Sequence, residues 1–302
     1  MADSKRKLSL VGDNPFHGVS HVSQDRANQR GQAIREPEYA AGIVAAAINN
    51  GAGGFTFTVD ETTLSILRLL RKYQFSSSPK LYAFIPYAYE YVRLAVSLGG
   101  IVGLARMIAT QIVLSGNYKA IVNGVKGALT VDPGSAFKAY AYYEAGRIKA
   151  AAGKKAELDC IFIHEVVTDM ALALDMQWLF NSHVDAMNEL DIRPGFHTRN
   201  LPFLLEKFRQ WDMKPDNIML TTPLNAIGMQ MNPSKTEAEK ALNNADGFDI
   251  IIFAILAGGL ITLEQAWSYL DGLPNIYGVA VGVSSKEQAE KTFSFISSRL
   301  NS

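Results

Sequence analysis

Short apolar segments alternate with helical segments along most of this chain of 302 residues. The apolar segments are almost free of polar residues, as expected of strands that are buried on both faces. Helices separate them, so neighbouring strands would run parallel. Eight such strands are expected, at residues 7–12, 55–59, 80–85, 158–163, 192–196, 217–221, 249–253 and 276–281. The alternation predicts an α/β fold, a (β/α)8 TIM barrel. A doubly wound open sheet would show the same alternation of strands and helices. However, the Gly-x-Gly-x-x-Gly motif that is typical of dinucleotide-binding sheets of that kind does not follow the first strand.

One long segment interrupts the alternation between the third and fourth strands. Residues 86–156 read as several helices broken at glycines and at Asp132–Pro133–Gly134. This segment is too long for a plain crossover, so part of it is expected to be a helical insertion that caps the end of strand 3. No repeat, low-complexity stretch or linker divides the chain. We therefore predict a single domain over residues 1–302, with 86–156 as the insertion.

The net charge and the cysteine content limit which binding partners and which cellular compartment we expect for this protein. The chain has 29 basic and 29 acidic residues, which argues against a nucleic-acid or anionic-membrane surface. Cys160 is the only cysteine, so no intrachain disulfide can form, and its apolar surroundings indicate a buried, inert thiol. The apolar tract 91–113 contains Arg93 and Arg106, which favours a buried helical pair over a membrane span. We expect a soluble, cytoplasmic protein with a small-molecule substrate and without membrane or nucleic-acid partners; the apolar insertion is compatible with a homodimer.

Polar side chains gather just after the expected strands. In a parallel barrel all strand carboxyl ends open onto one mouth, so these scattered residues become neighbours. Four of the five histidines belong to this set. Its members are Asn14, His17 and His21 after strand 1, Asp60 after strand 2, Tyr87 after strand 3, His164 and Glu165 after strand 4, His197 and Arg199 after strand 5, and Asn225 after strand 6. The pattern predicts an active site at the mouth.

Each candidate has a structural alternative. His164 and His197, which end buried strands, are predicted to be catalytic. Asp60 is either a catalytic partner or the cap of the helix that begins at Glu61. Arg199 either clamps a carboxylate or phosphate of the substrate or pairs with a surface acid. Asn14 and Asn225 are predicted to bind substrate. Strand alternation suggests that Glu165 points away from His164, and a structural ion pair is its alternative.

Imidazoles together with carboxylates are also the ligand types that zinc, manganese and iron accept. His17, His164, Glu165 and His197 are therefore candidate ligands of a divalent metal, which would polarise a carbonyl or acidify water. No closely spaced His-Glu-x-x-His motif is present. Without a metal, His164 with Asp60 or Glu165 would still form a general acid–base pair for enolisation, elimination or proton relay.

Residues 155–300 resemble the barrel of the aldo-keto reductases in the order and character of their segments. The strand that ends in His164 looks like the strand that delivers the family's catalytic histidine. Residues 254–260, Ala-Ile-Leu-Ala-Gly-Gly-Leu, look like the seventh-strand loop that lies over the dinucleotide. Residues 282–288, with Ser284 and Ser285, resemble the segment that holds the adenosine phosphate of NADP at a helix N-terminus. Asp60 would correspond to the family's catalytic aspartate.

The sequence departs from the family at three places. No tyrosine follows Asp60 at the family's short spacing, and strand 3 ends without the family's lysine. His197–Thr198 replaces the Ser-Asn pair that holds the nicotinamide amide. Tyr87 is a candidate for the replacement proton donor in a reductase.

These features lead to three hypotheses. The first is an enzyme that acts on a small polar carbonyl- or hydroxyl-bearing metabolite by histidine-centred acid–base or metal-assisted chemistry, as in lyases, isomerases and hydrolases. The second is a diverged NAD(P)H-dependent oxidoreductase of the aldo-keto reductase type. The third is a non-catalytic barrel that binds a metabolite or a partner through residues 86–156.

Overall fold

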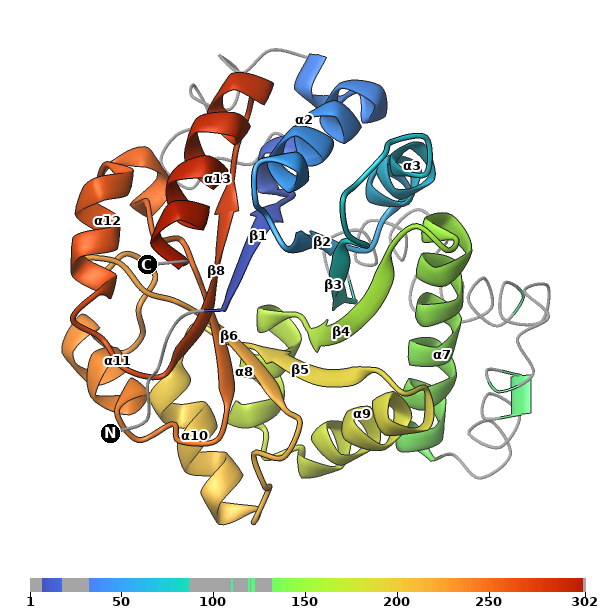
Figure 1. The fold of residues 1–302 in the computed structure, drawn as a ribbon. Helices are drawn as coiled ribbons and strands as arrows, with labels where there is room; N and C mark the ends of the chain where they lie inside the picture. The colour runs from blue at the N-terminus through green and yellow to red at the C-terminus, as the bar shows by residue number, and fades with distance from the viewer. Residues whose placement is uncertain are drawn as a thin grey trace.

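Eight parallel strands form a closed barrel in the computed structural model (Figure 1). The structure describes residues 7–17, 33–86, 110, 119, 121–122 and 132–300. The strands are β1 (Leu8–Gly12), β2 (Gly54–Thr58), β3 (Lys80–Ile85), β4 (Glu157–Ile163), β5 (Arg193–His197), β6 (Met219–Pro223), β7 (Asp249–Phe253) and β8 (Ile276–Gly282). They are paired in chain order, and β8 returns to β1 in register from Leu8 beside Gly278 to Gly12 beside Gly282. The predicted (β/α)8 barrel is confirmed.

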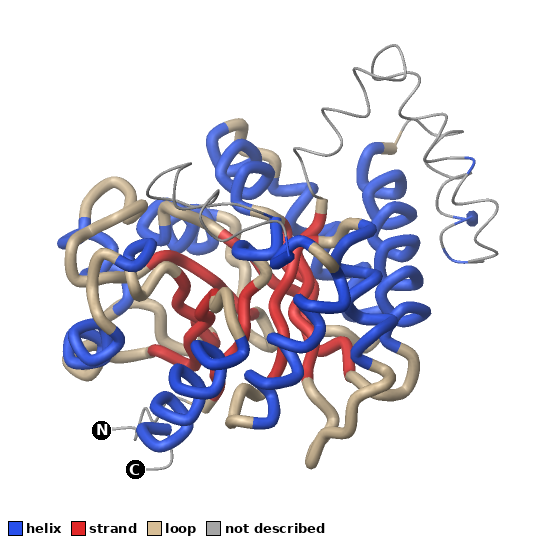
Figure 2. Tube along the Cα trace, turned by 90° about the horizontal axis from the view of Figure 1, so that it is seen from above, coloured by secondary structure: helices blue, strands red, loops and turns tan. Residues whose placement is uncertain are grey.

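Helices surround the strands on the outside of the barrel (Figure 2). They are α2 (Pro37–Asn49), α3 (Glu61–Leu70), α7 (Pro133–Ala152), α8 (Glu165–Ala173), α9 (Gln177–Glu189), α10 (Leu201–Gln210), α11 (Lys235–Leu242), α12 (Leu263–Leu270) and α13 (Lys286–Leu300), with short 3-10 turns η1 (Asn14–His17), η2 (Ala33–Arg35) and η3 (Ala257–Gly259). One expected helix is divided. The segment 169–190 contains the end of α8 and all of α9, because Asp175 takes a positive φ of 55° between them.

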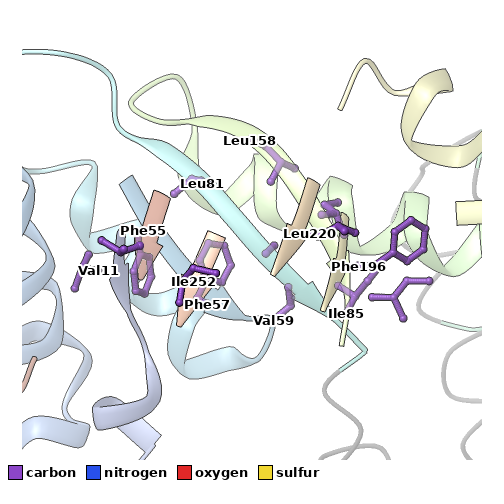
Figure 3. Close-up of a cluster of buried hydrophobic side chains, with 14 of the residues drawn as sticks. Val11, Phe55, Phe57, Val59, Leu81, Ile85, Leu158, Phe196, Leu220 and Ile252 are labelled. Carbon is purple, nitrogen blue, oxygen red and sulfur yellow. The ribbon is translucent and has the colours of Figure 1, made fainter. Parts of the chain in front are cut away.

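Strand alternation separates two layers of the core. Side chains on the outer face of the strands, among them Val11, Phe55 and Phe196, pack against the surrounding helices (Figure 3). A second cluster comes from strand residues alone and fills the barrel interior; its buried members are Leu8, Leu10, Tyr82, Cys160, Phe162, Met219 and Ile251. Cys160 is fully buried there, and burial raises the pKa of its thiol, as expected for an inert cysteine.

Part of the expected insertion belongs to the barrel itself. Helix α7 contacts both α3 and α9 and therefore occupies the position of the crossover helix between β3 and β4. Asp132 caps it by accepting hydrogen bonds from the backbone N–H groups of Gly134 and Ser135. The rest of the predicted insertion, residues 87–131, lies outside the described residues except at positions 110, 119, 121 and 122. None of the described helices combines the length and the apolar character that a bilayer crossing requires.

Gly54 should be essential to strand packing. A Cβ at this position would overlap the backbone carbonyl of Lys80 on β3, which cannot move without breaking the ladder. We expect Gly54→Ala to lower the free energy of unfolding by about 1–3 kcal/mol, the usual range for overpacking. Urea unfolding monitored by circular dichroism measures the change. Gly272→Ala is the matched control, because the nearest atom to its new Cβ would be 3.8 Å away; equal stability of the two variants would contradict the prediction.

Candidate active site

A cavity of about 550 Å³ opens at the carboxyl ends of the strands. Its floor is formed by apolar residues from the barrel interior, including Leu10, Phe162 and Ile251. Its polar wall is formed by Asp13, Asn14, His17, His164, Glu165, His197 and Arg199. The cavity continues past the loop after β7 to Ser284 and Gln288 at the start of α13. This is the mouth at which TIM-barrel enzymes carry their active sites.

His164 links the end of β4 to the start of α8. Its backbone N–H donates to the Ile85 carbonyl at 2.8 Å, so the strand ladder continues to this residue. Its side chain caps α8, because Nδ1 accepts the Val166 N–H at 3.4 Å. Burial lowers the pKa of His164, although the charges of Glu165 and Asp13 oppose the shift. His164 is therefore a neutral imidazole near pH 7, with its proton on Nε2.

His197 ends β5 in a largely apolar environment. Its ring lies 4.9 Å from the ring of Phe84, 4.6 Å from that of Phe253 and 5.8 Å from that of His164, measured between centroids. Burial lowers the pKa of His197 to about 4, and the charge of Glu165 only partly compensates. Nδ1 lies 3.0 Å from Glu165 Oε2 but without hydrogen-bond alignment, and Nε2 has no partner among the described residues. The ring thus presents an unsatisfied nitrogen beside the cavity.

Glu165 is the buried charge at the centre of this wall. It is the first residue of α8 rather than a continuation of β4, so both His164 and Glu165 line the cavity. The expectation that Glu165 points away from His164 is wrong, because strand alternation ends where the helix begins. Burial would raise the pKa of Glu165, but His197, His164 and Arg199 together lower it to about 2. Glu165 is therefore ionised.

Arg199, in the loop after β5, pairs with the carboxylate of Glu165. Its Nη2 donates to Glu165 Oε1 at 2.5 Å. The loop itself is anchored by Asp169 of α8, which accepts the Thr198 hydroxyl at 2.5 Å and the Arg199 backbone N–H at 3.2 Å. One third of the Arg199 side chain remains exposed, at 34%. Part of the guanidinium is therefore available to an anionic ligand, and its acidic partner is a buried cavity residue rather than a surface acid.

A second cluster of ionisable side chains consists of Asp13, His17 and Asp60, which follow β1 and β2. His17 Nε2 lies 3.2 Å from Asp13 Oδ2, and His17 Nδ1 lies 3.3 Å from Asp60 Oδ2. Asp13 Oδ2 also accepts the Thr58 N–H at 2.7 Å. Asp60 is the cap of α3, because its Oδ1 accepts the Thr63 N–H at 2.8 Å, while its Oδ2 faces His17. Asp13 was not predicted from the sequence; its position directly after β1, four residues before His17, was the available signal.

The remaining predicted residues are placed differently. Asn14 lines the cavity from η1. Asn225 is fully buried, and its amide exchanges hydrogen bonds with the backbone of Met229 at 2.8 and 2.9 Å, so it shapes its own loop and is not part of the cavity wall. Ser284 lines the cavity, whereas Ser285 caps α13 by accepting the Gln288 N–H at 3.1 Å. Tyr87 and His21 lie outside the described residues.

The predicted metal centre does not form among the described residues, in which no group of three or more His, Cys, Asp or Glu side chains is arranged to hold an ion. The hydrogen bonds explain this. Both ring nitrogens of His17 face carboxylates, His164 Nδ1 accepts a backbone N–H, and Glu165 Oε1 accepts from Arg199. The four predicted ligands are thus divided between two separate networks.

The far end of the cavity has the features of an anion site. Gly258 and Gly259 line it and take positive φ angles of 70° and 89°, which glycine adopts without strain, and the Gly259 N–H donates to the Leu256 carbonyl at 2.8 Å. The N–H and hydroxyl of Ser284 both donate to Gln288 Oε1, at 2.8 and 3.1 Å. A phosphate oxygen would accept the same two donors at the N-terminus of α13. A phosphate group would therefore fit at this end of the cavity.

Comparison with known proteins identifies the fold. No protein-family model and no curated protein sequence matches the chain. Among solved structures, it is similar to a presumed aldo-keto reductase from Pseudomonas aeruginosa, with a TM-score of 0.56 and 11% sequence identity over 98% of this chain and 91% of that one. The chain shares the (β/α)8 barrel fold of that structure. This confirms the resemblance seen in residues 155–300 and extends it to nearly the whole chain.

The buried histidines should make stability depend on pH. The pKa of His197 is about 4 in the folded protein, against an ordinary value of 6.5. As the pH falls through this window the unfolded chain binds the proton first, so the wild type should lose stability. His197→Gln should reduce that loss, measured as the difference in unfolding free energy between about pH 7 and about pH 4.5.

Phe253→Leu is the control for this measurement, because it alters packing against the same ring without removing a titrating group. It should lower stability at both pH values and leave the difference between them unchanged. The buried His183, whose pKa burial also lowers to about 4, should maintain part of the pH dependence in both variants. An undiminished pH dependence in His197→Gln would contradict the assignment of a neutral His197.

Proposed function

We propose that this barrel is an enzyme that transfers protons on a small, polar, carbonyl- or hydroxyl-bearing metabolite that also carries an anionic group. The observation that carries the proposal is the state of His164. Its Nδ1 accepts a backbone N–H, so the neutral ring carries its proton on Nε2 and lines the cavity. A neutral imidazole N–H can donate to a carbonyl oxygen and stabilise the negative charge that develops there on enolisation.

The neighbouring residues suit the same chemistry. Glu165 is ionised and is held by a hydrogen bond from Arg199. Its negative charge raises the pKa of His164 and so opposes part of the lowering that burial causes. The exposed part of Arg199 is suited to a carboxylate or phosphate of the substrate. His197 Nε2 offers a further polar contact beside Phe84 and Phe253. Isomerisation and elimination both begin with such an enolisation and remain the reaction types proposed.

Solvent exchange tests proton transfer without knowledge of the full reaction. The purified protein would be incubated in D2O with pyruvate, dihydroxyacetone phosphate, glyceraldehyde 3-phosphate and related small carbonyl acids and phosphates. Loss of the proton signal at the carbon beside the carbonyl, followed by NMR, reports the exchange. We expect His164→Gln to slow it about 100-fold or more, the usual contribution of a positioned acid.

His183→Gln is the matched control for His164→Gln. This histidine is fully buried on α9, its Nε2–H donates to the Ile161 carbonyl at 2.9 Å, and it does not line the cavity. Once both variants are shown to fold by circular dichroism, only the His164 variant should lose exchange. If no compound in the panel exchanges with the wild type, or if both variants exchange alike, the proposal is wrong.

A second candidate is an NAD(P)H-dependent oxidoreductase. The supporting observation is the continuity of the cavity from His164 to the glycine turn and Ser284. Residues 256–259, Ser284 and Gln288 would hold the phosphates, and a reduced nicotinamide would supply a hydride. On this chain His164 would hold the carbonyl oxygen and give it the proton that a tyrosine gives elsewhere in the resembled family.

Fluorescence titration with reduced NAD and reduced NADP tests this second candidate. We expect saturable binding in the wild type and at least about tenfold weaker binding in Ser284→Asp, because the new carboxylate would repel a phosphate at the helix N-terminus. Ser298→Asp, at the exposed far end of the same helix, should bind as the wild type does. Absence of saturable binding of both cofactors would eliminate the oxidoreductase.

A further inference from the structure

We infer that Asp13 is the catalytic carboxylate that removes the proton from the substrate carbon, and that His17 and Asp60 position it. The inference rests on the proposed function, for which it supplies the base that acts with His164. It concerns a residue that forms part of the cavity wall, whereas Asp60 is absent from that wall.

The two oxygens of Asp13 have different roles. Oδ2 accepts the Thr58 backbone N–H at 2.7 Å and faces His17 Nε2 at 3.2 Å. These contacts come from the end of β2 and from the last residue of η1, so they fix the carboxylate from two directions. Oδ1 takes part in neither contact. Asp13 is 5% exposed and lines the cavity, and in this proposal its Oδ1 is assigned to the substrate.

A chain of polar contacts extends this anchoring to a helix. His17 Nδ1 faces Asp60 Oδ2 at 3.3 Å. Asp60 Oδ1 is held by the Thr63 N–H at 2.8 Å, and the Asp60 N–H donates to the Thr63 hydroxyl at 3.1 Å in a reciprocal cap. Asp60 therefore moves only with α3. The imidazole between the two carboxylates cannot rotate without losing both contacts, so it transmits the position of α3 to Asp13.

His17 is a less suitable base than Asp13. Both of its ring nitrogens face carboxylate oxygens, so neither is directed at a ligand in this arrangement. Asp13 also acts on His164, because its negative charge is one of those that raise the affinity of His164 for a proton. Asp13 and His164 thus face one cavity from the ends of β1 and β4, and a substrate between them would contact a base and an acid.

The proposed step is balanced by these two groups. Asp13 takes the proton from the carbon next to the substrate carbonyl, and the electrons of that C–H bond form the carbon–carbon double bond of the enol. The carbonyl oxygen receives the displaced electron pair and a hydrogen bond, or the proton itself, from His164 Nε2. In a substrate with a hydroxyl group on the deprotonated carbon, Asp13 returns the proton to the former carbonyl carbon while that hydroxyl gives its proton to His164 Nε2, which completes an isomerisation. In an elimination, the enol gives its O–H proton back to His164 Nε2 and the carbonyl re-forms. The leaving group then departs, with its electron pair and the proton held by Asp13, from the carbon on the far side of the deprotonated carbon.

The exchange assay separates the three roles. With any carbonyl compound that the wild type exchanges, Asp13→Asn should lose at least about 100-fold in rate. His17→Ala should lower the maximal rate about tenfold with little change in KM, and His17→Gln should recover part of it, because its amide can still donate to Asp13 Oδ2. Asp60→Asn should have a smaller effect. Asp191→Asn, exposed before β5 at the opposite end of the barrel, is the control.

Nitrogen-15 NMR of the histidine rings provides a readout that does not need a substrate. In the wild type, we expect slowly exchanging ring N–H signals from His17, assigned by their loss in His17→Gln. Asp13→Asn and Asp60→Asn should each shift these signals, whereas Asp191→Asn should not.

The possible outcomes are distinct. If the wild type exchanges a substrate proton and Asp13→Asn still does so at a similar rate, the assignment of Asp13 is wrong and the proposed function stands. If His17→Gln is inactive while Asp13→Asn is active, His17 is the base and the inference is overturned. If the wild type exchanges nothing, the proposed function fails and the catalytic role of Asp13 fails with it. Unchanged His17 signals in both aspartate variants would overturn the positioning role.

Discussion

The pairing of β8 with β1 is the constraint on which the rest of the structure depends. It turns a series of parallel strands into a closed barrel and leaves no edge among them. Because every strand runs in the same direction, all carboxyl ends meet at one mouth. Residues as distant in sequence as Asp13, His164 and His197 then line one cavity. The glycines at tight strand contacts, of which Gly54 is the clearest, allow the strands to approach closely enough for this closure.

At the mouth of the barrel, burial and neighbouring charges set the protonation states of the histidines and of Glu165. The histidines at the ends of β4 and β5 are neutral because water is largely excluded from them. Glu165 stays ionised in the same environment because Arg199 and the two imidazoles surround it. A buried carboxylate without such partners would cost several kcal/mol, on the order of 3–5. The wall therefore contains neutral imidazoles beside fixed carboxylates, a combination that suits the proposed proton transfer.

The likeness to an aldo-keto reductase structure extends over almost the whole chain at 11% identity. At that level it concerns the path of the backbone, and a barrel of this kind supports many chemistries through its loops. At one end the cavity is lined by Gly258, Gly259 and Ser284, where the second proposed function places a cofactor phosphate. At the other end His17 and Asp13 provide ionisable groups from the segment after β1, and the first proposed function places the reaction there. The two candidate functions therefore depend on different ends of the cavity.

The sequence by itself determined the barrel, the strand positions to within a few residues, and the presence of His164, His197, Glu165 and Arg199 at the mouth. Strand and helix periodicity are local properties, so they are visible without coordinates. The tertiary structure alone decided which side chains meet. It showed that Asp60 is both a cap and a partner of His17, that Asn225 stabilises its own loop, and that Asp13 belongs to the site. Hydrogen-bond partners and burial depend on contacts between residues far apart in the chain, and no local pattern specifies them.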